Sequence, residues 1–124
     1  IKYLVSVGFI FDHRFKSFHK SSQIIRKKLL NQGSLKIISY FDGGSADDER
    51  WSVGKTYFRE DYEFLLQKVL DESWLGLIIK SKKPGTLKLR LGDTSQLLDE
   101  AIQTGRCYFN DESDYWSSYF DERP

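Results

Sequence analysis

The segment Trp74–Pro84, with the sequence WLGLIIKSKKP, decides how the rest of the chain is arranged. It opens with an apolar run and changes abruptly to the cationic run Lys80–Lys83 before its final proline. A helical pattern lies on each side of it. Short apolar runs between amphipathic helices are typical of the buried strands of parallel sheets. We therefore predict a central strand that carries cations to one edge of a sheet.

The bulk composition is that of one folded domain. The chain has 124 residues, 40% hydrophobic and 30% charged, and a chain of this size buries about two-thirds of its unfolded surface. The net charge of +1 is far from the strongly basic character of nucleic-acid-binding domains, so we expect no nucleic-acid partner. A single cysteine, Cys107, rules out an intrachain disulfide, and no apolar run approaches the roughly 18 residues of a membrane span. We expect a cytoplasmic protein without a membrane span.

Strand-like and helix-like segments alternate along the chain. Strands are predicted over Tyr3–Phe11, Leu35–Phe41, Trp74–Ile79 and Arg106–Phe109. Helices are predicted from a start between Ser17 and Ser22 to Asn31, over Phe58–Leu70 with Thr56 as N-cap, and from Asp93 or Thr94 to Thr104, with Leu97, Leu98, Ala101 and Ile102 facing the core. Gly33 and Gly105 are expected to end the first and last of these helices.

The segment Thr86–Leu91 fits two structures. Its leucines alternate with charged residues as in a strand, whereas the preceding Pro84 and Gly85 are also consistent with a helical turn. We leave both alternatives open.

This order of elements predicts an α/β fold with three layers, α/β/α, around a mostly parallel, Rossmann-like sheet of about four strands. We assign residues 1–110 to this domain and residues 111–124 to an acidic, aromatic tail that continues into a longer protein. The first residue, Ile1, already lies inside an apolar run. That beginning is consistent with a piece of a longer chain and equally with a processed N-terminus.

Open parallel sheets bind their ligands outside the carboxyl ends of the strands. The polar segments expected at these ends are Asp12-His13, Asp42-Gly43-Gly44-Ser45, Lys80–Lys83 and Asn110. If the sheet is parallel, these four segments lie along one edge. We expect the functional site there.

Each candidate group at this edge has a functional and a structural interpretation. Lys80, Lys82 and Lys83 are suited to bind a diphosphate as point charges, or form a solvated basic loop. The backbone N–H groups of Gly43, Gly44 and Ser45 are suited to hold a phosphate, or these residues form a plain turn.

The histidines and the cysteine carry less chemical information. His13 beside Asp12 is a candidate general base with an orienting carboxylate, or a surface residue. His13, His19 and Cys107 lack the spacing of metal ligands, so we predict no metal site. We expect His19 on the surface and Cys107 as a buried apolar filler.

One part of the chain resembles a known family. The run LIIKSKKP follows the acidic-aromatic helix DYEFLLQKVLDES and precedes a capped helix and RCYF. Over about Asp61–Phe109 it is similar to bacterial glycosyltransferases of surface-polysaccharide biosynthesis, of the two-domain GT-B class. In that class a strand commonly ends in a turn resembling Ile-Lys-Pro-(His/Lys)-Pro. Lys80 and Lys83-Pro84 match this turn, whereas Ser81 stands where proline is common.

The resemblance implies part of the nucleotide-sugar-binding half of such an enzyme, with a nucleotide-sugar donor and a carbohydrate acceptor and without a cofactor or metal. The second domain and a further Gly-rich helix N-terminus would follow Pro124, so activity of this chain alone stays open. The alternative is a non-catalytic α/β binding or interaction domain. A phospho-acceptor receiver-like domain has the same element order, but the paired acids after its first strand are missing here.

Overall fold

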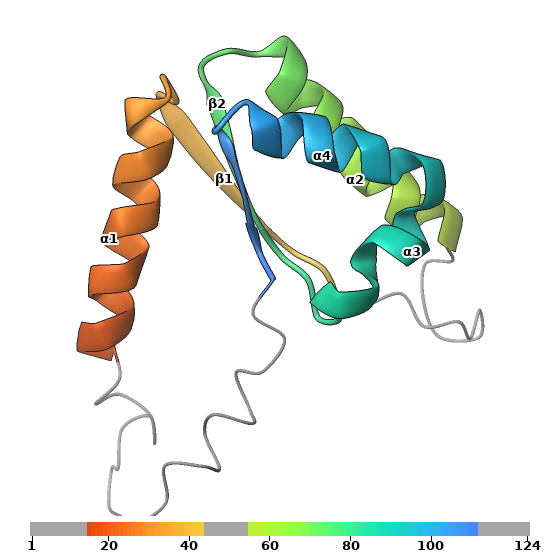
Figure 1. Cartoon of the computed structure of the whole chain (residues 1–124), viewed down its shortest axis with the longest axis horizontal. Helices are drawn as coiled ribbons and strands as arrows, with labels where there is room; N and C mark the ends of the chain where they lie inside the picture. The colour runs from red at the N-terminus through yellow and green to blue at the C-terminus, as the bar shows by residue number, and fades with distance from the viewer. Residues whose placement is uncertain (1–14, 44–54, 112–124) are drawn as a thin grey trace, which may run out of the picture.

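The computed structural model describes residues 15–43 and 55–111. The elements in these ranges are α1 (Phe15–Asn31), β1 (Lys36–Phe41), α2 (Lys55–Asp71), β2 (Leu75–Lys80), α3 (Leu87–Leu91), α4 (Ser95–Gln103) and β3 (Cys107–Asn110), as shown in Figure 1. Two short 3-10 turns, Pro84–Thr86 and Gly92–Thr94, flank α3. The predicted strand Tyr3–Phe11 and the tail from residue 112 lie outside the described residues.

The described strands form one parallel sheet in the order β1-β2-β3. The pairing of β1 with β2 runs in register from Lys36↔Leu75 to Phe41↔Lys80. The predicted parallel α/β fold and the central position of the Trp74–Ile79 strand are thereby confirmed. The described part holds three strands where about four were predicted, because the first predicted strand is not among the described residues.

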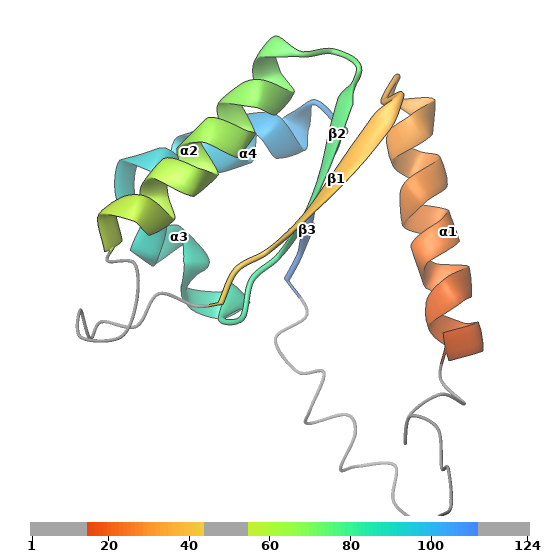
Figure 2. The ribbon, with the colours of Figure 1, turned by 180° about the vertical axis from the view of Figure 1, so that it is seen from behind.

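The hydrophobic core lies on one face of the sheet, under α2 and α4 (Figures 1 and 2). Alternate residues of β2 point to opposite faces, and Leu75, Leu77 and Ile79 point toward these helices and are buried. The helices contribute the buried residues Phe58, Tyr62, Leu66, Val69, Leu98 and Ala101. The apolar face predicted for the second helix is therefore the core-facing side of α2.

The other face of the sheet is covered by α1 and is less completely packed. Among the described side chains of α1, Leu29 alone is buried, and Ile24 is 71% exposed. Gly76 of β2 allows the chain before β1 to approach this face. A Cβ atom at Gly76 would lie 2.7 Å from Ser34 Oγ. This distance is too short for a carbon–oxygen contact, so a larger residue at this position would force Ser34 to move.

Several local predictions are corrected by the structure. α2 begins at Lys55, so Thr56 lies inside the helix and is not its N-cap. Ile102 is 37% exposed and does not join the core. The predicted helix ends are confirmed at Gly33 and Gly105, whose positive φ angles of 96° and 73° belong to the left-handed region that favours glycine.

The ambiguous segment Thr86–Leu91 is helical, as α3 and the turn before it. Leu87 and Leu91 are both 0% exposed, whereas Leu89 is 83% exposed. A strand would have placed all three leucines on one face, whereas a helix places Leu87 and Leu91, four residues apart, on one face and turns Leu89 away from it. The helical period therefore decides this segment.

Candidate functional site

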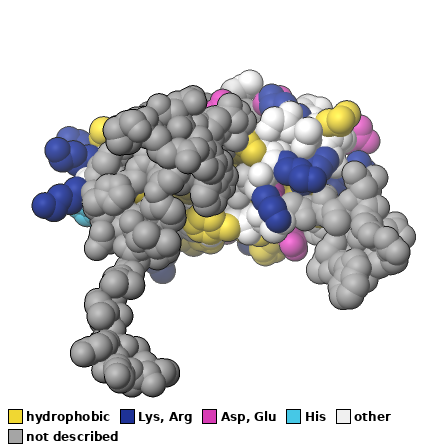
Figure 3. All heavy atoms as spheres, turned by 90° about the horizontal axis from the view of Figure 1, so that it is seen from below, with side chains coloured by type: hydrophobic (Ala, Val, Ile, Leu, Met, Phe, Trp, Pro, Cys, Tyr) yellow, Lys and Arg dark blue, Asp and Glu magenta, His cyan; other side chains and the backbone are white. Residues whose placement is uncertain are grey.

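The carboxyl ends of the strands meet at one edge of the sheet, as the sequence predicts. The backbone N–H of Asp42, directly after β1, donates to Lys80 O at 3.2 Å. Lys80 pairs in register with Asn110 at the end of β3. Figure 3 views the molecule from the side toward which the strands run and shows Lys and Arg side chains on that face.

Asp42 is the centre of the polar contacts at this edge. The residue is only 9% exposed. Its Oδ2 accepts a hydrogen bond of 2.6 Å from the hydroxyl of Tyr62 in α2, and its Oδ1 accepts one of 2.9 Å from the backbone N–H of Lys82. Buried carboxylates require such partners on both oxygens. Asp42 therefore ties the chain after β2 to β1 and to α2.

Two tyrosines reinforce this attachment. Burial, followed by the hydrogen bond and charge of Asp42, raises the pKa of Tyr62 far above its ordinary value of 10.0, so its hydroxyl remains a donor. Burial and the nearby Asp61 raise the pKa of Tyr40 to about 12. The Tyr40 hydroxyl donates to Asp61 Oδ2 at 3.3 Å, and the rings of Tyr40 and Tyr62 meet edge to face at 5.2 Å between centroids.

Arg90 of α3 holds the loop that follows β2. Its Nη2 donates to Ser81 Oγ and to Lys83 O, each at 3.0 Å. Ser81, which is 1% exposed, also accepts from the backbone N–H of Lys83 at 3.2 Å. The guanidinium lies 4.8 Å from the centre of the Phe58 ring, a cation–π distance. The backbone from residue 81 to residue 83 is thus fixed from two sides.

The predicted site residues are only partly brought together. Lys82 and Lys83 are exposed neighbours on this fixed loop. Lys80 is half-buried on the α1 side of the sheet, because it follows the core-facing Ile79 in the strand. Gly43 is exposed, and Asp12, His13, Gly44 and Ser45 lie outside the described residues.

The roles of Asp42 and Arg90 were missed by the sequence analysis. Asp42 was noted only as the start of a turn, and its partner Tyr62 is 20 residues away. Arg90 stands in the segment whose structure was left open. A polar residue directly after a predicted buried strand is a usable signal, but spacing alone does not indicate its partner.

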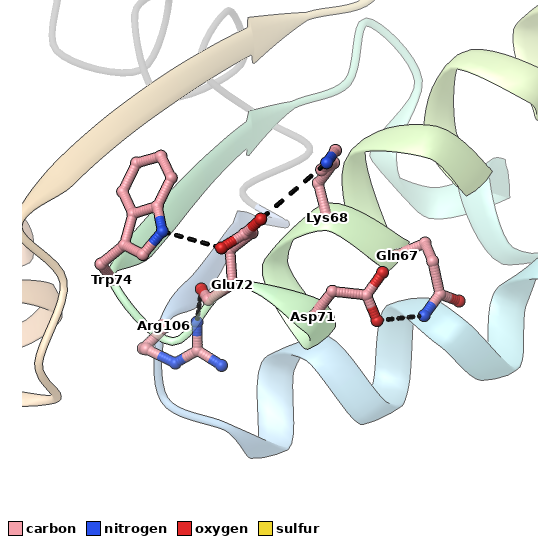
Figure 4. Close-up of polar contacts among 6 residues, drawn as sticks. All are labelled: Gln67, Lys68, Asp71, Glu72, Trp74 and Arg106. Carbon is pink, nitrogen blue, oxygen red and sulfur yellow. Dashed lines mark hydrogen bonds and ion pairs between the residues drawn. The ribbon is translucent and has the colours of Figure 1, made fainter.

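The opposite, amino edge of the sheet carries a second polar cluster, drawn in Figure 4. Arg106 is 8% exposed, and its Nη1 donates to Glu72 O at 2.7 Å and to Leu75 O at 3.0 Å. Trp74 Nε1 donates to Glu72 Oε2 at 2.8 Å. Arg106 thereby joins the turn before β3 to the turn before β2, which is a structural task.

The remaining candidates have simple structural environments. Cys107 is 5% exposed, as expected of a filler, and burial raises the pKa of its thiol to about 12. His19 is exposed on α1, as expected. Among the described residues, no cluster of His, Cys, Asp and Glu is placed to hold a metal ion, and no helix is both long and apolar enough to cross a membrane.

No family model, curated protein or solved structure matches the chain. A functional proposal must therefore rest on the geometry of the carboxyl edge and on the motif at the end of β2.

Proposed function

We propose that this chain is the nucleotide-sugar-binding part of a glycosyltransferase of the GT-B class that makes surface carbohydrate, and that the loop after β2 binds the diphosphate of the donor. The observation that carries the proposal is the fixed backbone beneath Lys82 and Lys83. The buried Asp42 carboxylate holds the N–H of Lys82, and Arg90 holds the carbonyl of Lys83.

A fixed loop with two exposed ammonium groups suits an anionic ligand. Among the described residues, no carboxylate lies within ion-pair distance of Lys82 or Lys83, whereas Lys88 is paired with Asp99 at 2.6 Å. Because the loop backbone is already ordered, the loop loses less conformational entropy when a ligand binds there. Cations aimed at a leaving diphosphate stabilise the charge that develops as the glycosidic bond to it breaks.

The sequence motif supports the same interpretation. Lys80 and Lys83-Pro84 match the turn that ends a strand in the GT-B class, and β2 is the central strand of the described sheet. The proposal includes a bacterial source and a cytoplasmic setting, with which the single Cys107 is consistent. The nucleotide-sugar is a substrate here and not a resident cofactor.

A second candidate function is that of a non-catalytic interaction domain. Exposed apolar side chains near the outer edge of β1 favour it: Leu35 is 80% exposed, Phe41 71% and Ile38 43%. Exposed apolar surface of this kind often contacts another protein. The two candidates differ in ligand, since only the transferase requires the lysine loop to bind a nucleotide.

A thermal-shift titration separates the candidates. The full chain is titrated with UDP, CDP, GDP and their sugars at millimolar concentration, because a ligand that binds only the folded state raises the apparent stability, by about 2.7 kcal/mol at one hundred times its Kd. The same series is repeated on Lys82→Ala/Lys83→Ala. The matched control is Lys20→Ala/Lys27→Ala, which removes two exposed lysines of α1.

We expect a nucleotide-specific rise that the control keeps and the loop variant loses. A rise that both variants keep would place the nucleotide elsewhere and contradict the lysine site. No rise with any nucleotide would favour the interaction domain.

A further inference from the structure

The outer edge of β3 is open within the described part of the chain. The N–H of Leu77 in β2 donates to Arg106 O at 2.8 Å. Backbone groups alternate in direction along a parallel strand, so the N–H and C=O groups of Cys107 and Phe109 point away from β2. No described strand pairs with this edge. Such an edge is a template for one more strand.

A groove of about 240 Å³ follows this edge. Its walls come from α1, through Ile25 and Leu29, and from the end of α4 and the turn after it. Its floor includes Cys107, Tyr108 and Phe109, consecutive residues whose side chains point alternately to the two faces of the sheet. Because residues of β3 from both faces of the sheet line this groove, the groove lies beside β3 in the plane of the sheet. A neighbouring strand would occupy that position.

The handedness of the fold specifies which segment belongs there. The chain passes from β1 to β2 through α2, and from β2 to β3 through α3 and α4, on one face of the sheet, whereas α1 lies on the other face (Figures 1 and 2). Connections between parallel strands are right-handed in about 98% of cases. Right-handed connections on the face covered by α2 and α4 lead from β1 toward β3. A right-handed connection on the α1 face leads the chain across the sheet in the opposite direction, from the β3 side toward β1. By this rule, a strand that precedes α1 in a parallel arrangement would lie on the β3 side of β1.

The positions nearest to β1 on that side are already filled. β1 pairs directly with β2, from Lys36↔Leu75 to Phe41↔Lys80, and β2 pairs directly with β3. No strand fits between them. The outer edge of β1 would require a left-handed connection. Among the described strands, the first open position is the outer edge of β3, and α1 packs against β3.

We propose that Tyr3–Phe11 occupies this groove as a fourth parallel strand, with the order β1-β2-β3-(3–11). The segment, YLVSVGFIF, is rich in the β-branched and aromatic residues that favour strands. A nine-residue strand spans about 30 Å, more than the length of β3. α1 begins at the carboxyl edge of the sheet (Figure 1), so residues 12–14 form the short connection that is usual between a strand and its helix.

This position has a consequence for the candidate site. Asp12 and His13 come to the carboxyl edge beside Asn110, two strand spacings or about 10 Å from the end of β2. The strand position itself does not depend on the proposed diphosphate site.

Disulfide cross-linking in the full chain tests the strand position. In a Cys107→Ala background, Phe109→Cys is combined in turn with Val5→Cys, Ser6→Cys and Val7→Cys, because a disulfide requires Cα atoms about 4.4–6.8 Å apart. The matched control replaces Phe109→Cys with Ser39→Cys, an exposed position on β1 at the other edge. Peptide mapping by mass spectrometry identifies the intramolecular bond.

We expect one of the three partners to cross-link with residue 109 at least about tenfold faster than any cross-links with residue 39. Faster cross-linking to residue 39, or equal rates at both edges, would overturn the proposal. Amide hydrogen exchange of the unaltered chain provides a second readout, since a paired edge protects the N–H groups of Cys107 and Phe109. Exchange of both groups at the rate of unstructured peptide would also overturn the proposal.

Discussion

An arginine stabilises each edge of the sheet, but the two arginines have different surroundings. At the amino edge, the buried Arg106 donates from one nitrogen to two carbonyls, those of Glu72 and Leu75. At the carboxyl edge, the half-buried Arg90 donates to Ser81 Oγ and Lys83 O, beside the Asp42 carboxylate that holds the N–H of Lys82. The contacts of Arg106 at the amino edge are buried, whereas those of Arg90 at the carboxyl edge support a loop with exposed lysines.

The two edges of this small sheet therefore differ in what their contacts leave exposed. Arg106 is only 8% exposed and donates to two backbone carbonyls, so it is poorly accessible to a ligand. At the other edge, the internal contacts occupy Asp42 and Ser81 and leave the ammonium groups of two neighbouring residues in solvent. We therefore expect substitutions at the amino edge to act mainly on folding, and those at the carboxyl edge to act more on the loop.

The largest effect is expected from Arg106→Met. The variant keeps much of the buried side-chain volume but leaves the carbonyls of Glu72 and Leu75 without this donor. Hydrogen bonds that involve a charged group contribute about 1.5–3 kcal/mol, so we expect the free energy of unfolding to fall by about 2–4 kcal/mol. Urea unfolding followed by circular dichroism measures the change.

The control for this prediction is Lys68→Met in the same cluster. Lys68 Nζ lies 4.0 Å from Glu72 Oε1, and both side chains are well exposed, so its loss is expected to change stability by less than about 0.5 kcal/mol. Equal effects of the two variants would show that Arg106 does not lock the amino edge.

An intermediate effect is expected from Tyr62→Phe, which removes the 2.6 Å hydrogen bond to Asp42 Oδ2. Near neutral pH we expect a loss of about 1–3 kcal/mol. The pKa of Tyr62 is raised in the folded state above its ordinary value of 10.0. Its stabilising contribution is therefore complete below about pH 10 and is lost as the pH rises further. The stability gap between wild type and Tyr62→Phe should narrow in alkali.

Unfolding measured between about pH 8 and about pH 11 tests this sign. Tyr57→Phe is the matched control, because Tyr57 lies on the same helix and is 59% exposed. If the difference in the free energy of unfolding between wild type and Tyr62→Phe stays constant over this range, the inference that burial beside Asp42 keeps Tyr62 protonated is wrong.

The comparison also shows what the sequence can and cannot predict. The apolar run Trp74–Ile79 between two helical patterns correctly predicted a central strand of a parallel sheet. The parallel topology then correctly predicted that Asp42, Lys80 and Asn110 lie at one edge, because parallel strands end on the same side of a sheet. The contacts that build the two edges join residues 20 and 34 positions apart. Contacts between residues so far apart produce no periodic pattern in the sequence, so the sequence did not predict them.

The ambiguity at Thr86–Leu91 has a related cause. Leucines at every second position satisfy the strand pattern, while Leu87 and Leu91 also satisfy the helical spacing of four. The core beneath α2 and α4 selects between the two patterns by burying this pair and exposing Leu89. That core is assembled from distant segments, so the decision was not available from the segment alone.

The smallest effect on stability is expected from Arg90→Met, about 1 kcal/mol. The methionine still packs against Phe58, and Ser81 Oγ keeps its hydrogen bond from the Lys83 N–H. Because Asp42 holds the N–H of Lys82 independently of Arg90, and Lys83 O also accepts from the N–H of Thr86 at 3.3 Å, exchange of the Lys82 amide should stay slow. Urea unfolding and amide exchange measure both, with Lys88→Met on the same helix as control. A loss as large as that of Arg106→Met would show that Arg90 stabilises the fold as strongly as Arg106 does, and would contradict the expected difference between the two edges.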